Sequence, residues 1–250
     1  MLRFYLRNTL LSPAMIVGII GLLSAMLVGM NFHNDLLYCY QYTISLGVTS
    51  FFIPVATVLP VCFMQKQMNA GNNIRYICLM RSSRRSFSGS ALLSAVLSGM
   101  LIMLGAFLLF TAFCSINSVG HPYLGKGMFS YQTVFYDVLS EYPRMLYLLM
   151  GAVFTLNGAI WPAISLLCFA FTSSQYLALA IPFVVRTGMG YLMQSTGWFY
   201  LDPSQLLLKG VANQLPGGGI PYVLLYSAVV VLLCGFFWNY SIKSPAKKCQ

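Results

Sequence analysis

The sequence predicts an all-α membrane protein with six transmembrane helices and both termini in the cytoplasm. Of its 250 residues, 58% are hydrophobic and only 7% are charged, whereas a soluble domain carries roughly 25% charged residues. So few charges cannot cover a water-soluble surface of this size. In lipid, backbone groups must bond within helices or a closed barrel. The long unbroken apolar runs favour helices over the short alternating strands of a barrel.

Six segments are long enough to cross a bilayer, because about 20 residues at 1.5 Å rise each span about 30 Å of hydrocarbon. They cover residues 12–30, 44–63, 90–113, 145–171, 176–193 and 221–240. Pro162 predicts a kink or tilt in the fourth span. Residues 172–175 alone separate the fourth span from the fifth, which predicts a tight hairpin. Without internal repeats or room for a soluble domain, we expect residues 1–250 to form one membrane domain.

The placement of charge predicts the orientation in the membrane. If six spans alternate, ten of the fourteen basic residues fall on one side. These are Arg3, Arg7, Lys66, Arg75, Arg81, Arg84, Arg85, Lys243, Lys247 and Lys248. The other side receives Lys126, Arg144, Lys209 and all four acidic residues, Asp35, Asp137, Glu141 and Asp202. The positive-inside rule places the basic side in the cytoplasm. The net charge of +10 is then an orientation signal that suits anionic lipid heads, and it does not predict a nucleic-acid partner.

The N-terminal residues mix Arg3 and Arg7 with apolar side chains, and Ser12 and Pro13 follow. An amphipathic segment along the inner membrane face has this pattern, and so does a simple extension of the first span. No small-residue cleavage site ends the first apolar run, so we expect a retained span. The seven cysteines show no paired metal spacing. Cys39 and Cys114 both fall near the predicted outer surface, where a disulfide between them stays open.

The connection between the second and third spans carries a second amphipathic pattern. Ile74, Ile77 and Cys78 recur at helical spacing, which predicts a short cytoplasmic helix with one apolar face. Such a face needs the membrane surface or another protein as its partner. The arginines from Arg81 to Arg85 follow where the third span enters the bilayer. An ordinary basic anchor loop explains these arginines but not the preceding helix.

This layout resembles the membrane subunit of a type-2 ABC exporter over nearly the whole chain, although the matching motifs are loose. That family has a short amphipathic start, six spans, a coupling helix between spans two and three, a tight cytoplasmic turn between spans four and five, and a re-entrant external segment before span six. Phe63, Gly71 and the arginines from Arg81 to Arg85 match the family's aromatic, glycine and basic turn. The family's acidic residue is missing, because Lys66 and Gln67 stand near its place. A salt bridge from that position to an ATPase is therefore not expected.

The resemblance implies that energy comes from a partner. The chain has no G-x-x-x-x-G-K-[ST] loop to cradle ATP phosphates and is expected to bind no cofactor itself. ATP and Mg²⁺ would bind two separate ATPase subunits, whose closure would move the helix at 65–80 and tilt the second and third spans. A second permease copy or a related permease would complete the path. The implied ATPase-coupling residues are Gln67, Gly71, Ile74, Arg75, Ile77, Arg81, Arg84 and Arg85.

Two segments are candidates for the translocation path or its gate. Asp202, Pro203 and Gly210 form a helix start and stop signature, and the resemblance implies a re-entrant external helix here. Its apolar residues Leu206 and Leu207 favour contact with membrane or protein, although an external surface helix without gating remains an alternative. Arg186 lies about ten residues into the fifth span, where a charge must face protein, water or a partner. It lines the path and attracts an anionic group, bonds backbone carbonyls, or snorkels to the interface if the span is displaced.

Enzymatic chemistry has little support in the sequence. The two histidines, His33 and His121, both fall outside the spans, and no G-x-S-x-G motif occurs. Asp137 and Glu141 stand four residues apart, a spacing compatible with a paired-carboxylate or cation site, but a solvated polar face beside Tyr136 and Tyr142 is the favoured interpretation. We therefore expect a transport subunit and not an enzyme.

The favoured function is a permease subunit of an ATP-driven exporter in a bacterial-type plasma membrane. Its substrate would be a peptide, a drug-like amphiphile or a lipid-linked glycan. The alternatives are an ATP-independent secondary transporter or channel, an intramembrane enzyme, and a non-transporting accessory or immunity protein. The spans contain no acidic residue or histidine for ion coupling, which counts against a secondary transporter.

Overall fold

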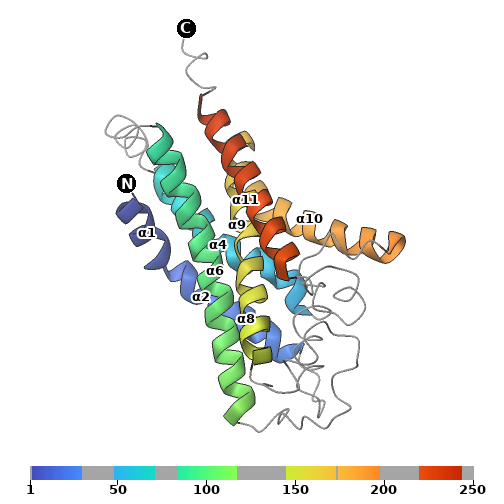
Figure 1. The fold of residues 1–250 in the computed structure, drawn as a ribbon. Coiled ribbons are helices and arrows are strands. Elements are labelled where there is room, and N and C mark those ends of the chain that lie inside the picture. The colour runs from blue at the N-terminus through green and yellow to red at the C-terminus, as the bar shows by residue number, and fades with distance from the viewer. Residues whose placement is uncertain are drawn as a thin grey trace.

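The computed structural model of the chain describes residues 2–29, 48–70, 84–116, 145–172, 174–197 and 220–243. These residues form helices and no strand (Figure 1). In chain order the helices are α1 (Leu2–Leu10), α2 (Pro13–Val28), α4 (Val48–Ala70), α6 (Arg84–Ile116), α8 (Met145–Asn157), α9 (Ile160–Thr172), α10 (Gln175–Thr196) and α11 (Ile220–Lys243). The all-helical class that composition predicts is confirmed.

Length and composition identify several helices that can cross a membrane. Four candidate spans stand in the described residues, and a fifth arises if the bent pair α1–α2 counts as one span. The four are Thr49–Lys66, Ser86–Ile116, Gly151–Thr172 and Pro221–Ser241. Helix α10 occupies the predicted fifth segment but is not among them. The number of six spans therefore stays a prediction.

A break separates α1 from α2, as the pair Ser12 and Pro13 predicts. Ser12 has extended backbone (φ −76°, ψ 145°) and Pro13 is the first residue of α2. A residue before proline is driven out of the helical region, and proline suits the first helical position. The Ser12 hydroxyl donates to the Thr9 carbonyl at 2.7 Å, which closes the end of α1. The two helices diverge by 49°, so the first helix is more than a straight extension of the first span.

The kink expected in the fourth segment is a break between α8 and α9. The Gly158 and Ala159 amides turn back to donate to the carbonyls of Thr155 and Leu156, each at 3.0 Å. Pro162, the third residue of α9, explains the position, because a proline ring clashes with the carbonyl four residues earlier. The predicted continuous segment 145–171 is thus two helices, and the distortion precedes the proline by one turn.

Helix α6 packs against α1, α2, α4, α8, α9 and α11. One stretch of it carries small buried residues, Ala91, Ser94, Ala95 and Ser98, followed by Gly99. Small residues let membrane helices approach closely. A Cβ atom on Gly99 would collide with the Gly158 carbonyl oxygen and lie 2.5 Å from Pro162 Cγ. Farther along α6 from this contact, a large apolar core includes Leu22, Ile53, Ile102, Phe110 and Phe154.

Replacing Gly99 with alanine should destabilise the protein, because the backbones of α6 and the α8–α9 turn would have to separate. We expect a cost of about 1–3 kcal/mol, as for other overpacked sites, measured as a lower unfolding midpoint in detergent. Gly21→Ala is the matched control, because no atom lies within 4 Å of a Cβ placed there. That control should leave the midpoint unchanged or slightly higher. Equal midpoints for the two variants would contradict the close approach.

Candidate functional site

One end of the bundle collects the basic residues of the described helices. Helix α1, the last turn of α4, the first turn of α6 and the last turn of α11 all lie at this end (Figure 1). Their basic residues are Arg3, Arg7, Lys66, Arg84, Arg85 and Lys243. The described part of the chain contains no Asp or Glu and one further basic residue, Arg186. We call this end the basic end; it is the side that charge placement predicts to be cytoplasmic.

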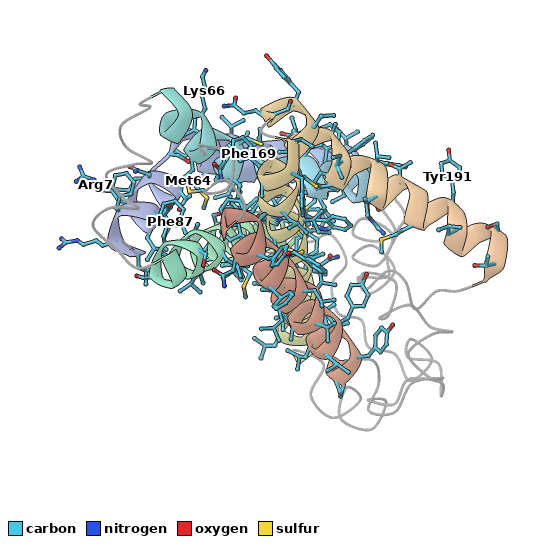
Figure 2. All side chains as sticks on the ribbon, turned by 90° about the horizontal axis from the view of Figure 1, so that it is seen from above. Arg7, Met64, Lys66, Phe87, Phe169 and Tyr191 are labelled. Carbon is cyan, nitrogen blue, oxygen red and sulfur yellow. The ribbon has the colours of Figure 1, made fainter. Side chains whose placement is uncertain are left out.

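An apolar cluster joins five helices beneath the basic end. We call it the Tyr5 cluster; it consists of Tyr5, Val61, Met64, Phe87, Ala91, Ala95, Leu166 and Trp238. The Tyr5 side chain is fully buried, and its ring meets the edge of Phe87 at 5.6 Å between centroids. Figure 2 shows Met64 of α4 close to Phe87 of α6. The ends of α4 and α6 are therefore held together through a residue of α1.

Three of the residues implied to couple to an ATPase lie in the described ends of α4 and α6. Gln67 lies in the last turns of α4, and Arg84 and Arg85 begin α6. Five others lie outside the described residues: Gly71, Ile74, Arg75, Ile77 and Arg81. The sequence predicts the coupling helix over residues 65–80, but residues 65–70 are the last turns of α4. Residues 71–83, which we call the coupling segment, lie outside the described residues.

Polar contacts reinforce the packing between α1, α6 and α11. The hydroxyls of Thr9 and Ser94 are 2.6 Å apart, and Thr9 Oγ1 also donates to the Tyr5 carbonyl at 2.9 Å. Ser88 Oγ donates to Asn239 Oδ1 at 3.3 Å. Hydrogen bonds between membrane helices contribute roughly 0.6–2 kcal/mol each. These residues are not among the candidates named from the sequence. Serines 90, 94 and 98 nevertheless recur every four residues along one helix face, a pattern that indicates a helix face able to pack closely and form hydrogen bonds.

Arg186 lies against protein at the opposite end of α4 from the Tyr5 cluster. Its side chain is 5% exposed, and its Nη2 donates to Ser50 Oγ at 2.6 Å. Ser50 lies in the first turn of α4, next to Phe51, whose ring packs 6.5 Å from that of Phe183 in α10. Because the candidate span of α4 starts at Thr49, Arg186 lies level with the end of that span. A charge costs less there than at mid-bilayer depth.

Helix α10 runs antiparallel to α4. Near its start, the Gln175 carbonyl oxygen lies 3.9 Å from Cys62 Sγ, towards the end of α4. Eleven residues later, Arg186 contacts Ser50 at the beginning of α4. The inward face of α10 consists of Ala178, Pro182 and Arg186, spaced by four residues. The first half of α10 therefore lies along α4 between Ser50 and Cys62, whereas its second half projects sideways from the bundle (Figure 1).

Several sequence predictions fall outside the described residues. These are the gate residues Asp202, Pro203, Leu206 and Leu207, the pair Asp137 and Glu141, and the two histidines. Cys114 is buried in α6, but Cys39 is also outside, so the disulfide stays a prediction. Within the described ranges, no three His, Cys, Asp or Glu side chains gather as a metal site.

The break between α8 and α9 brings polar groups into the bundle interior. Asn157, the last residue of α8, is 1% exposed. Its Oδ1 and the Thr155 hydroxyl are buried without a hydrogen-bond partner among the described residues. Ser227 of α11, which packs on α9, is buried in the same way. Sequence reasoning missed these residues because a single Asn within an apolar run carries no spacing signal.

No protein-family model, curated protein or solved structure matches this chain. The proposed function therefore rests on the described helices and their contacts.

Replacing Tyr5 with alanine should loosen the basic end. Loss of a fully buried aromatic ring costs about 3–5 kcal/mol, so we expect a clear fall in the unfolding midpoint in detergent. Phe4→Ala is the matched control, because the neighbouring Phe4 ring is 39% exposed. Tyr5→Phe should retain most of the stability, since the ring supplies the packing. A Tyr5→Ala variant as stable as Phe4→Ala would show that the cluster does not hold α1.

Proposed function

We propose that the chain is the membrane-spanning permease subunit of an ATP-driven ABC exporter. The observation that carries the proposal is the Tyr5 cluster at the basic end. There, the two helices flanking the predicted coupling segment are bound to each other and to α1. An ATP-independent channel has no need of rigid supports around a cytoplasmic loop.

The packing favours transfer of motion from residues 71–83 to the spans. A helix transmits an axial push because its backbone hydrogen bonds are internal and regular. Met64 near the end of α4 and Phe87 near the start of α6 share one buried cluster. Displacement of the connecting segment would therefore move both helices together, because close-packed side chains transmit strain. Two separately mobile helices would absorb the same displacement.

The course of α10 supports a sixth crossing. If α4 crosses the bilayer from Thr49 to Lys66, the segment of α10 from Gln175 to Arg186 runs in the opposite direction along the part of that span from Cys62 to Ser50. Its low hydropathy is tolerable because Arg186 bonds Ser50 and faces protein. With six crossings, both termini lie on one side, and the basic end faces the cytoplasm by the positive-inside rule. An ATPase would bind at this face.

The filled interior of the described bundle favours a path made by two chains. Its central cluster contains large apolar side chains such as Met26, Phe107 and Trp161 from three different helices. Close-packed interiors leave little room for a substrate. A path between this chain and a second permease copy or a related partner avoids the difficulty. The substrate would be a peptide, a drug-like amphiphile or a lipid-linked glycan exported across a bacterial-type plasma membrane.

Co-purification tests the proposal. The intact complex, extracted in mild detergent, should contain an ATPase subunit whose ATP hydrolysis depends on the permease. Ile74→Asp should release that subunit, because a charge on the apolar face of the predicted coupling helix opposes docking. Val119→Asp is the control, since it places the same charge in a connection predicted on the other side. A fully active preparation without any nucleotide hydrolysis would refute the proposal.

Arg186→Ala should reduce transport while leaving the complex assembled. The variant removes the positive charge that the sequence places in or beside the path. Ser50→Ala is the comparison, because it removes the hydrogen bond to Nη2 and keeps the charge. Substrate export from intact cells or vesicles should fall several-fold in the first variant and little in the second. Equal losses would assign Arg186 a role in packing alone.

A further inference from the structure

The short helix α1 has an unusual distribution of side chains around its axis. The face that meets the bundle consists of Tyr5, Thr9 and Ser12, all buried, so it places two hydroxyl side chains beside one aromatic ring. These residues follow the i, i+4, i+7 spacing of one helix face. Thr9 meets Ser94 and Tyr5 meets Phe87, so this side is occupied by protein. Surface helices usually bury apolar residues and expose polar ones, whereas α1 buries the hydroxyls of Thr9 and Ser12 and leaves Phe4 and Leu11 exposed.

The outward surface of α1 combines arginines with exposed apolar residues. Arg3 and Arg7 stand one turn apart, and both are exposed. Figure 2 shows Arg7 pointing away from the bundle. On one flank of the arginines lie Phe4 and Leu11, which are 39% and 78% exposed. On the other flank lies Leu2, which is 38% exposed, followed by the half-buried Leu6 and by Leu10, which packs against the apolar core. The arginines thus emerge between two apolar stripes.

The position of α1 limits what can cover this surface. Helix α1 bends by 49° from α2 and lies at the basic end, so it leaves the course of the first span near one face of the bilayer. No ion pair within the described residues engages Arg3 or Arg7, and those residues include no carboxylate. A nine-residue helix is marginal by itself in water. Contacts on its outer side as well as its inner side therefore favour its folding.

We propose that α1 is a binding surface for anionic phospholipids. Arg3 and Arg7 contact the lipid phosphate groups, while the exposed side chains of Leu2, Phe4 and Leu11 insert at the boundary of the acyl chains. Apolar insertion and attraction to anionic heads act together in helices of this kind, and arginine stems lie along apolar surface while their charged heads reach outward. Tyr5, Thr9 and Ser12 meanwhile dock the same helix on α6. Lipid binding at α1 is independent of whether an ATPase engages the basic end.

Hydrogen exchange of the full chain in lipid nanodiscs tests this proposal. One set of discs contains phosphatidylcholine alone, and the other contains about one third phosphatidylglycerol. Each arginine near an anionic surface strengthens binding about fivefold, so residues 2–10 should exchange at least about fivefold more slowly in the anionic discs. The difference should shrink in high salt, because salt screens surface charge. Peptides from α2 provide an internal reference and should not respond.

Charge variants separate lipid binding from folding of α1. Arg3→Gln/Arg7→Gln should lose the difference between the two lipids, and Arg3→Lys/Arg7→Lys should keep it. Lys126→Gln/Lys209→Gln removes two charges from the predicted opposite side and should also keep it. Equal protection of residues 2–10 in both lipids overturns the proposal, as does a difference that survives in the glutamine variant. Protection that follows protein density and ignores lipid charge also overturns it and assigns the surface to a second copy.

Discussion

Close approach of helices to α6 is the constraint on which the rest of the structure depends. In a bilayer, the hydrophobic effect does not drive helices together, because lipid tails are as apolar as leucine. Association must come from dense packing and interhelical hydrogen bonds. The small residues of α6 between Ala91 and Gly99 permit both. They bring Ser94 to Thr9 and Gly99 to the turn at Gly158, so α1, α8 and α9 are all positioned by one short stretch of α6.

The break between α8 and α9 lies at the same contact, where Gly158 meets Gly99. Pro162 disrupts the helix one turn earlier, at a glycine. Because Gly158 has no side chain, the irregular backbone can lie directly on Gly99. Irregular backbone at membrane depth is tolerated where protein covers it, and α6 provides that cover. Pro162, Gly158 and Gly99 therefore act together to allow this contact, although Gly99 and Gly158 stand 59 positions apart in the sequence.

The described helices divide their charge between two ends of the bundle. At the basic end, arginines and lysines stand on the helices that form the Tyr5 cluster. An ATPase and lipid are proposed to bind different surfaces of this end. The ends of α4 and α6 present the connection proposed to meet an ATPase, whereas the outer side of α1 is proposed to meet lipid. Tyr5 links the two, because its ring lies between α1 and Phe87 of α6. At the other end, Arg186 is accommodated by Ser50 in the first turn of α4.

The sequence by itself determined the helical class, most of the apolar segments and the separation of charge, because these depend on composition and on local periodicity. It also located the boundary at Ser12 and Pro13, since the effect of proline on its neighbour is local. Only the tertiary structure decided which small residues meet, that the fourth segment is broken at Gly158, and that Arg186 bonds Ser50. It also decided that α1 buries the hydroxyls of Thr9 and Ser12 together with the ring of Tyr5. Such features depend on pairs of residues far apart in the chain, and the hydropathy of a single segment contains no information about its partner.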